Sequence, residues 1–201
     1  ISRYYSCDSK FLVFVFSETG SFLFSKEILT SNDYLSIDTS LNFFPEESSG
    51  TFLVFCVPEI DANCSDYRVI NRGYVGYSSN ENPSMVHGNL VAFGLHSSPS
   101  GGYSIQSIKS LVNPRKILTT YHLQIPLDRQ CEVNLIFVNP FTNRDVQVWC
   151  LDQRLIIPPF GCGKMVFNQP AIEVLAIKSD FLFPRPLVSI NRDGYCDFLH
   201  G

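Results

Sequence analysis

Residues 133–149 read VNLIFVNPFTNRDVQVW and predict two β-strands joined by a polar turn. Residues 133–138 are mostly apolar, and residues 145–149 alternate between polar and apolar side chains, as in a strand with one buried face. The residues between them, 139–144, contain the Asn and Pro that favour turns. We therefore predict a β-hairpin in this part of the chain.

Apolar runs and alternating stretches of the same kind occur along the rest of the chain. They are rich in Val, Ile, Phe and Tyr and are bounded by Gly, Pro, Asn and Ser, as strands commonly are. A short helix is conceivable only in residues 105–118, where Pro114 would interrupt it. Short strands about ten residues apart predict an all-β protein, built as an antiparallel sandwich or barrel. The further strand candidates are residues 11–16, 21–25, 51–55, 164–167, 172–177 and 186–190.

The composition limits the class of protein. The chain has 201 residues, 45% of them hydrophobic, and 15 Lys and Arg against 19 Asp and Glu give a formal net charge of −4. A chain of this length and hydrophobicity buries a core, and its mild acidity argues against nucleic acid as a partner. No apolar run reaches the roughly 18 residues that a membrane helix needs, so we expect no membrane span.

Seven cysteines are present, an odd number, and none belongs to a C-x-x-C pair. The spacings typical of zinc and redox sites are therefore absent, and several cysteines lie in strand-like apolar runs. We interpret them as buried free thiols, which favours a reducing, cytoplasmic compartment. A secreted protein whose signal peptide was removed before Ile1 is the alternative. The cysteines are Cys7, Cys56, Cys64, Cys131, Cys150, Cys162 and Cys196.

An internal duplication is the predicted domain organisation. Residues 96–102 (HSSPSGG) have the composition of a loop and divide the chain into two stretches of similar length. The sequence INRGY at 70–74 returns as INRDGY at 190–195. We predict two tandem, related antiparallel β-sandwich units, and one large sandwich of unrelated strands is the alternative. The predicted divisions are residues 1–95 for the first unit, 96–117 for a linker and 118–201 for the second unit.

The two matching segments carry side chains suited to ligand binding, and each is followed by a His-Gly pair. Arg offers a planar fork of donors for carboxylate, phosphate or sugar hydroxyls, a Tyr ring stacks on a sugar face, and His and Asn add hydrogen bonds. A structural role is the alternative, in which the glycines mark a β-bulge and the arginines pair with acids. The predicted ligand-binding residues are Arg72, Tyr74, Tyr77, His87, Asn89, Arg192, Tyr195 and His200.

Common catalytic and metal-binding motifs are absent from the sequence. Residues 161–164 (GCGK) are similar to part of a phosphate-binding loop, but Pro158 and Met165 replace the Gly and the Ser or Thr that such a loop needs. We interpret them as a hairpin turn with glycines at positive φ. There is no G-x-S-x-G, H-x-H or H-E-x-x-H pattern, and we predict neither a metal nor another cofactor.

The residues together predict a non-enzymatic binding module for a polar small molecule or a carbohydrate, held near the interface of the two halves. One alternative is an enzyme acting on a carbohydrate or nucleotide-sugar, with His87 or His200 as general base and Arg72 as electrostatic clamp. Such an enzyme should place a histidine beside a carboxylate, whereas a binding module should present an aromatic platform. The other alternative is a structural subunit of a homo-oligomer, which should expose a large apolar patch.

Residues 131–190 follow the order strand, Asn-rich turn, alternating strand, Pro-containing turn (157–161, IPPFG) and two more strands. In this order the segment resembles the sensory-rhodopsin-transducer family of β-sandwich proteins. The resemblance implies a small sandwich that oligomerises and serves in signalling or ligand binding, without catalysis. Residues 74–89 are similar to bacterial proteins of unknown function. Neither resemblance assigns a role to an individual residue.

Overall fold

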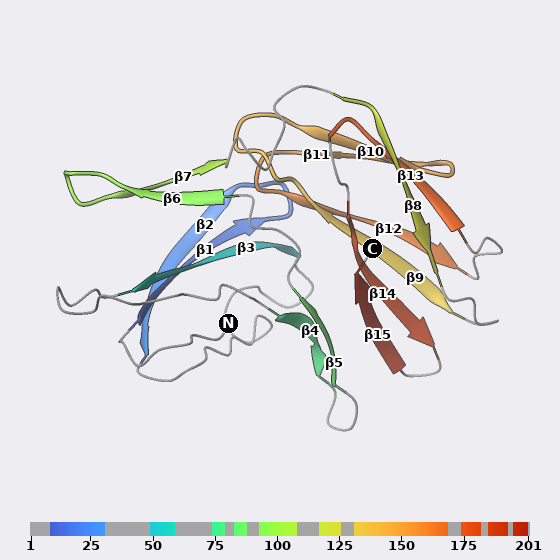
Figure 1. Cartoon of the computed structure of the whole chain (residues 1–201), viewed down its shortest axis with the longest axis horizontal. Coiled ribbons are helices and arrows are strands. Elements are labelled where there is room, and N and C mark those ends of the chain that lie inside the picture. The colour runs from blue at the N-terminus through green and yellow to red at the C-terminus, as the bar shows by residue number, and fades with distance from the viewer. Residues whose placement is uncertain are drawn as a thin grey trace.

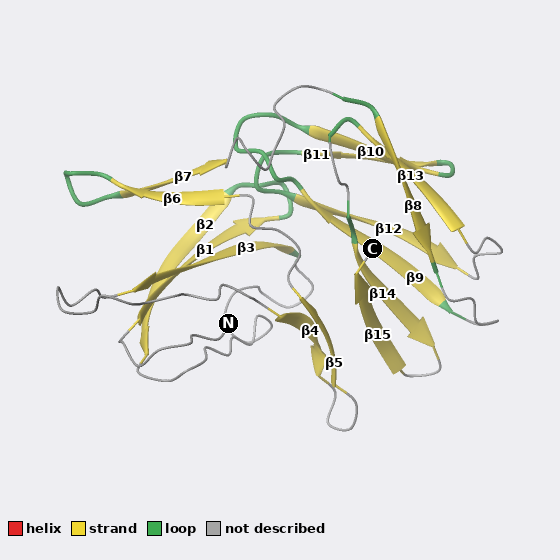
Figure 2. Cartoon of the chain, viewed as in Figure 1, coloured by secondary structure: helices red, strands yellow, loops and turns green. Residues whose placement is uncertain are grey.

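The structure is a computed structural model. Every regular element in the residues that it describes is a β-strand, and every strand pairing is antiparallel. Figure 2 shows this part of the chain as strands joined by loops and turns, so the predicted all-β class is confirmed. Within the same residues, no helix is long and apolar enough to cross a membrane. The described residues are 9–30, 49–58, 74–78, 83–87, 93–107, 117–125, 131–168, 174–181, 185–192 and 195–200.

The described strands of the carboxy-terminal half form a sandwich of two four-stranded sheets (Figure 1). The first sheet has the strand order β11-β10-β13-β8, and the second has the order β12-β9-β14-β15. The strands of the first sheet are β11 (Gln153–Ile157), β10 (Val146–Cys150), β13 (Val174–Ser179) and β8 (Thr119–Gln124). Those of the second sheet are β12 (Cys162–Asn168), β9 (Glu132–Val138), β14 (Leu187–Arg192) and β15 (Tyr195–His200).

The core lies between these two sheets and follows from the alternation along each strand. In β10, Val146 and Val148 are fully buried, while Gln147 and Trp149 face outward. In β9, Val133 and Leu135 are fully buried from the other side. The inward side chains of both sheets join in one continuous hydrophobic cluster. Each fully buried aliphatic side chain of this size stabilises the fold by about 1.5–3 kcal/mol.

The predicted hairpin over residues 133–149 is wrong, although both of its strands exist. β9 and β10 belong to opposite sheets, so the loop between them crosses from one sheet to the other. Asn139 is completely buried in this loop, and its Nδ2 donates to the carbonyl oxygens of Arg144 (2.8 Å) and Ile157 (2.9 Å). Its Oδ1 accepts from the backbone N–H of Phe141 at 2.8 Å. The Asn-rich segment is therefore a crossover held by a buried asparagine, and β10 pairs with β11 instead.

The amino-terminal strands form a separate three-stranded sheet in the order β2-β1-β3. β1 lies in the middle, where Val13 and Val15 are fully buried against partly buried side chains of β2 and β3. β1 and β2 form a true hairpin, whose turn has Gly20 at a φ of +80°. Strands are present at all three predicted positions in this region. They are β1 (Ser9–Ser17), β2 (Phe22–Thr30) and β3 (Gly50–Pro58).

Two further hairpins complete the described elements. Residues 98–102, which we predicted as part of a linker, form the turn of the second hairpin, where the Ser98 N–H donates to the Gly102 carbonyl at 2.7 Å. The predicted linker at 96–117 therefore contains a strand, because its breaker residues turn the chain back on itself. The hairpins consist of β4 (Tyr74–Ser78) with β5 (Pro83–His87), and β6 (Phe93–Ser97) with β7 (Tyr103–Ser107).

The described elements do not show the predicted duplication. β1 and β2 pair directly in one sheet, whereas their expected counterparts β9 and β10 lie in opposite sheets. The matching segments also differ, because Tyr74 and His87 lie at the two ends of the hairpin β4–β5. Tyr195 and His200 instead begin and end the single strand β15. Residues 70–73 of the first matching segment lie outside the described residues.

The three-stranded sheet meets the sandwich through two turns that contact each other at their backbones. The Cys162 N–H donates to the Glu18 carbonyl oxygen at 3.1 Å. A Cβ atom on Gly20 would lie 1.9 Å from the carbonyl oxygen of Pro159, and one on Gly161 would lie 2.6 Å from that of Glu18. Both distances are shorter than any real contact, so this seam requires glycine on each side.

An aromatic residue provides the positive φ of the turn at residues 158–161, which corrects the expectation that a glycine does so. Phe160 has a φ of +60°, and the Gly161 N–H closes the turn on the Pro158 carbonyl at 2.9 Å. The Phe160 ring stacks on Phe16 with centroids 4.5 Å apart, and on Phe93 at 5.6 Å. A left-handed non-glycine residue costs about 1–3 kcal/mol, and these ring contacts offset that cost.

Candidate functional site

The predicted ligand-binding residues fall in two segments that the structure brings side by side. Strand β15 contacts both strands of the hairpin β4–β5 (Figure 1). In the hairpin, Tyr74 is the register partner of His87, and Tyr77 is that of Ser84. Arg72 and Asn89 lie outside the described residues.

On the carboxy-terminal side, Arg192 of β14 is the register partner of Tyr195, and His200 ends β15 opposite Leu187. The Arg192 guanidinium forms an ion pair with Asp197, with Nη2 3.1 Å from Oδ2. The alternative of an enzyme predicts a histidine beside a carboxylate. The carboxylate is paired with an arginine instead, and both side chains are partly exposed at the surface.

The outer face of the second sheet carries a polar network in which the amide donors of two asparagines meet one carboxylate. The Glu132 carboxylate accepts hydrogen bonds from Nδ2 of Asn134 at 2.9 Å and Nδ2 of Asn191 at 3.0 Å. These two bonds, with a smaller contribution from Lys164, lower the pKa of Glu132. Asn134, which is only 5% exposed, also lies 3.4 Å from the Ser189 hydroxyl. The donors of this network are directed at groups of the same sheet, so its evident role is to stabilise the sandwich.

The outer face of the first sheet is different, and we call it the Trp149 face. It consists of the residues on β11, β10, β13 and β8 whose side chains point away from the core, and it holds Trp149, the one tryptophan in the sequence. Its other members include two permanent cations and no carboxylate, and apart from Gln147 and Trp149 they are exposed. The face consists of Arg154, Ile156, Gln147, Trp149, Val174, Ala176, Lys178, Thr120, His122 and Gln124.

Trp149 lies in a row that crosses the sheet. It is the register partner of Arg154 on β11 and of Lys178 on β13, and Lys178 is in turn opposite Thr120 on β8. Since adjacent strands are about 4.8 Å apart, the row places the backbones of the two cationic residues about 10 Å apart, with the indole between them. The Arg154 Cζ lies over the indole ring, 5.7 Å from its centroid, so the guanidinium faces one side of the ring.

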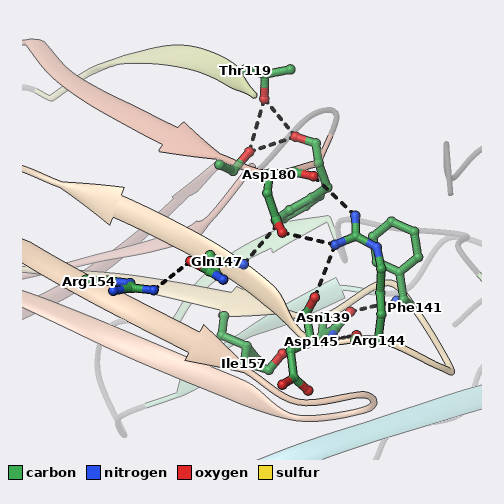
Figure 3. A network of polar contacts seen from close by, with 11 residues as sticks. Thr119, Asn139, Phe141, Arg144, Asp145, Gln147, Arg154, Ile157 and Asp180 are labelled. Carbon is green, nitrogen blue, oxygen red and sulfur yellow. Dashed lines mark hydrogen bonds and ion pairs between the residues drawn. The ribbon is translucent and has the colours of Figure 1, made fainter. Parts of the chain in front are cut away.

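A chain of hydrogen bonds holds the guanidinium of Arg154 in place (Figure 3). Its Nη2 donates to Oε1 of Gln147 at 2.8 Å, and the Gln147 backbone N–H donates to Oδ1 of Asp180 at 2.9 Å. Asp180, which is 5% exposed, pairs with Arg144 through Nη1 and Oδ2 at 3.2 Å. The Arg144 Cζ is 3.8 Å from the centroid of the Phe141 ring, which fixes the other end. A largely buried ion pair thus supports the strand whose Gln147 orients the exposed guanidinium of Arg154.

Hydroxyl groups tie the same end of the sheet together. The hydroxyls of Thr119 and Ser179 lie 3.0 Å apart, and each donates to the Phe181 carbonyl oxygen at 2.7 Å (Figure 3). They join the start of β8 to the end of β13, next to Asp180. The strands that carry the Trp149 face are therefore fixed relative to each other at this end.

Nucleophilic and metal chemistry have little support in the described residues. Cys150, Cys162 and Cys196 carry free thiols, and burial raises the pKa of Cys150 to about 11. Burial also raises the pKa of Cys162. In the part of the chain that the structure describes, no group of three His, Cys, Asp or Glu side chains is placed to hold a metal ion. A thiol with a raised pKa is a poor nucleophile at neutral pH.

Sequence reasoning did not select the residues of the Trp149 face. The alternation in residues 145–149 already places Gln147 and Trp149 on the face opposite the buried valines, so one signal was present. The cross-strand neighbours Arg154 and Lys178 depend on register, and the pairing of β10 with β13 joins segments far apart in the sequence. The alternation of polar and apolar residues therefore does not predict that Arg154, Trp149 and Lys178 lie side by side.

Comparison of the chain with protein-family models, with curated proteins and with solved structures finds no match. The resemblance to the sensory-rhodopsin-transducer family therefore stays a prediction, and the functional conclusion must rest on the geometry of the site.

Proposed function

We propose that this chain is a non-enzymatic binding module that recognises a carbohydrate on the Trp149 face. The observation that carries the proposal is the indole of Trp149 on an open sheet face, beside an arginine that is already held by Gln147. An aromatic ring offers the apolar face of a sugar a stacking surface, and a fixed guanidinium offers hydrogen bonds to its oxygens. We expected an aromatic platform of a binding module rather than of the alternative enzyme, so this combination supports the proposal.

Recognition on this face would be an equilibrium process without bond cleavage. A sugar ring would stack on Trp149, and the remaining N–H groups of Arg154 would donate to its oxygen atoms. Because the hydrogen bond to Gln147 holds the guanidinium before the ligand arrives, less conformational entropy is lost on binding. The predicted site at β4–β5 and β14–β15 stays a prediction, and the ion pair of Arg192 with Asp197 favours a structural role for that arginine.

The test is a glycan array followed by titration calorimetry of the strongest binder. We expect Trp149→Ala to weaken binding at least about 100-fold, since tryptophans are frequent hot spots, and Trp149→Tyr to retain most of it. The matched control is Val138→Ala, which removes an exposed apolar side chain from the other sheet and should bind like the unmodified protein. Binding by Trp149→Ala at full strength, or no binding to any glycan, would overturn the proposal.

A second candidate function is that of a subunit in a homo-oligomer, and the edge strand β2 supports it. β2 is an edge of its sheet, and its residues Phe22 and Leu29 are 58% and 66% exposed. An exposed apolar edge strand is a template for pairing with another chain. We expect light scattering to detect dimers that Leu29→Lys abolishes. A monomer at all concentrations would exclude this function.

A further inference from the structure

We infer that the carbohydrate bound by the Trp149 face is anionic, with carboxylate or sulfate groups on the sugar units beside the stacked ring. The inference rests on the proposed function and names its ligand class. It is carried by the charge of the face and by the placement of its two permanent cations on either side of Trp149.

The charge of the face is opposite to that of the chain. The chain carries a formal net charge of −4, yet the outward residues of these four strands include Arg154, Lys178 and His122 and no Asp or Glu. Asp145 and Asp152 are exposed, but they lie in the segments before and after β10 rather than on the face. A cationic face on an acidic chain attracts an anionic ligand, while the net negative charge of the chain disfavours binding of that ligand elsewhere.

The geometry suits charges that are spaced along a polymer. The strands of Arg154 and Lys178 lie on opposite sides of the strand of Trp149, about 10 Å from each other. A sugar stacked on the indole would therefore have one cation toward each neighbouring unit. Arg154 presents a planar fork that fits a carboxylate or sulfate, and Lys178 supplies a compact charge that tolerates either.

Single-stranded nucleic acid is the other anionic polymer that stacks on aromatic rings, and the observations favour the glycan. Nucleic-acid grooves combine several stacking residues with many cations along the phosphate backbone. The Trp149 face offers one aromatic ring and two permanent cations, on a chain that is acidic overall. That arrangement fits a sparsely charged polysaccharide better than a polyphosphate chain.

The experiment compares charged polymers with their neutral counterparts. Calorimetry would use polygalacturonate against its methyl ester, and heparin against desulfated, carboxyl-reduced heparin. We expect at least one charged member to bind about tenfold or more tightly than its neutral partner, and raising NaCl from about 0.05 M to about 0.5 M should remove that difference. Lys178→Gln should weaken binding of the charged member about tenfold while leaving the neutral member unchanged, and Arg154→Gln, which also removes hydrogen bonds to the sugar, should weaken the charged member more than the neutral one. Lys26→Gln, a change of an exposed lysine on β2, is the matched control.

The outcomes separate this inference from the proposed function. If neutral glycans bind through Trp149 as tightly as charged ones, the ligand class is wrong and the binding module stands. If no glycan of either kind binds, the proposed function fails as well. If single-stranded DNA binds more tightly than either charged polysaccharide, and Trp149→Ala abolishes that binding, the face recognises nucleic acid and both are overturned.

Discussion

The two outer faces of the sandwich use the same alternating strands in opposite ways. On the second sheet, Glu132, Asn134 and Asn191 direct their polar atoms at one another, and Asn134 is almost completely buried. On the first sheet, Arg154 and Lys178 are exposed beside Trp149, and the hydrogen bond to Gln147 orients a guanidinium without hiding it. Polar residues on a sheet face therefore stabilise the fold where they satisfy each other, and remain available to a ligand where they do not.

The largest effect should come from breaking the support beneath the Trp149 face. Asp180→Ala removes the partner of the partly buried Arg144 and the acceptor of the Gln147 N–H, so we expect it to lower the free energy of unfolding by about 3 kcal/mol, the lower end of the range for a broken buried pair. Urea denaturation measures this loss. The control Asp145→Ala, at an exposed position, should change stability by less than about 0.5 kcal/mol. A loss below about 1 kcal/mol for Asp180→Ala would mean that the ion pair does not support this face.

The next effect should separate the two faces directly. Glu132→Ala leaves two amide donors without their charged acceptor, and we expect it to cost about 1–3 kcal/mol of stability with no effect on ligand binding. Lys178→Ala should do the reverse, with a stability change within about 0.5 kcal/mol and weaker binding. Chemical denaturation measures the stability of each variant, and calorimetry measures its affinity for the ligand. If Glu132→Ala also abolished binding, the division of roles between the faces would be wrong.

A smaller effect should appear as a dependence of stability on pH. The hydrogen bond from Asn134, and to a smaller extent that from Asn191, lowers the pKa of Glu132. The ionised carboxylate of Glu132 therefore stabilises the folded state. This contribution is fully present above the ordinary pKa of about 4.3 and is lost as the pH falls through the lowered value. We expect the stability advantage of the unmodified protein over Glu132→Gln to shrink between about pH 5 and pH 3. An advantage that is constant over this range would show that Glu132 has an ordinary pKa.

The smallest expected effect tests whether the two sides of β10 are independent. Cys150 faces the core with a pKa of about 11, so it should resist iodoacetamide at about pH 8 in the folded protein and react once the protein unfolds. Trp149→Ala should leave this protection unchanged, because residue 149 faces the other way. Peptide mapping by mass spectrometry measures the labelling. Rapid labelling of Cys150 in Trp149→Ala would mean that the indole also maintains the core.

The sequence predicted the more apolar strands but few of their partners, and β4 to β8, β11 and β15 were not among the predicted strands. Alternation identifies which side of a strand is buried, and it correctly predicted strands at residues 133–138 and 145–149. It does not specify whether two such strands pair within one sheet or face each other across a core. Here that choice depends on Asn139, whose buried side chain satisfies the backbone of the crossover. The same limit applies to the site, because the row through Trp149 exists only in the register of the folded sheet.

The contact of the two turns at Gly20 and Gly161 limits how the amino-terminal sheet can move relative to the sandwich. At Gly20 and Gly161, main chain lies directly against main chain, without the rotatable bonds that side chains place between two packed sheets. Rotation of the three-stranded sheet against the sandwich would require these backbones to separate and would break the Phe160 stack with Phe16. The direction in which the Trp149 face points is therefore set by direct backbone packing and hydrogen bonding between the two turns, and a bound polymer would take a fixed angle to the amino-terminal sheet.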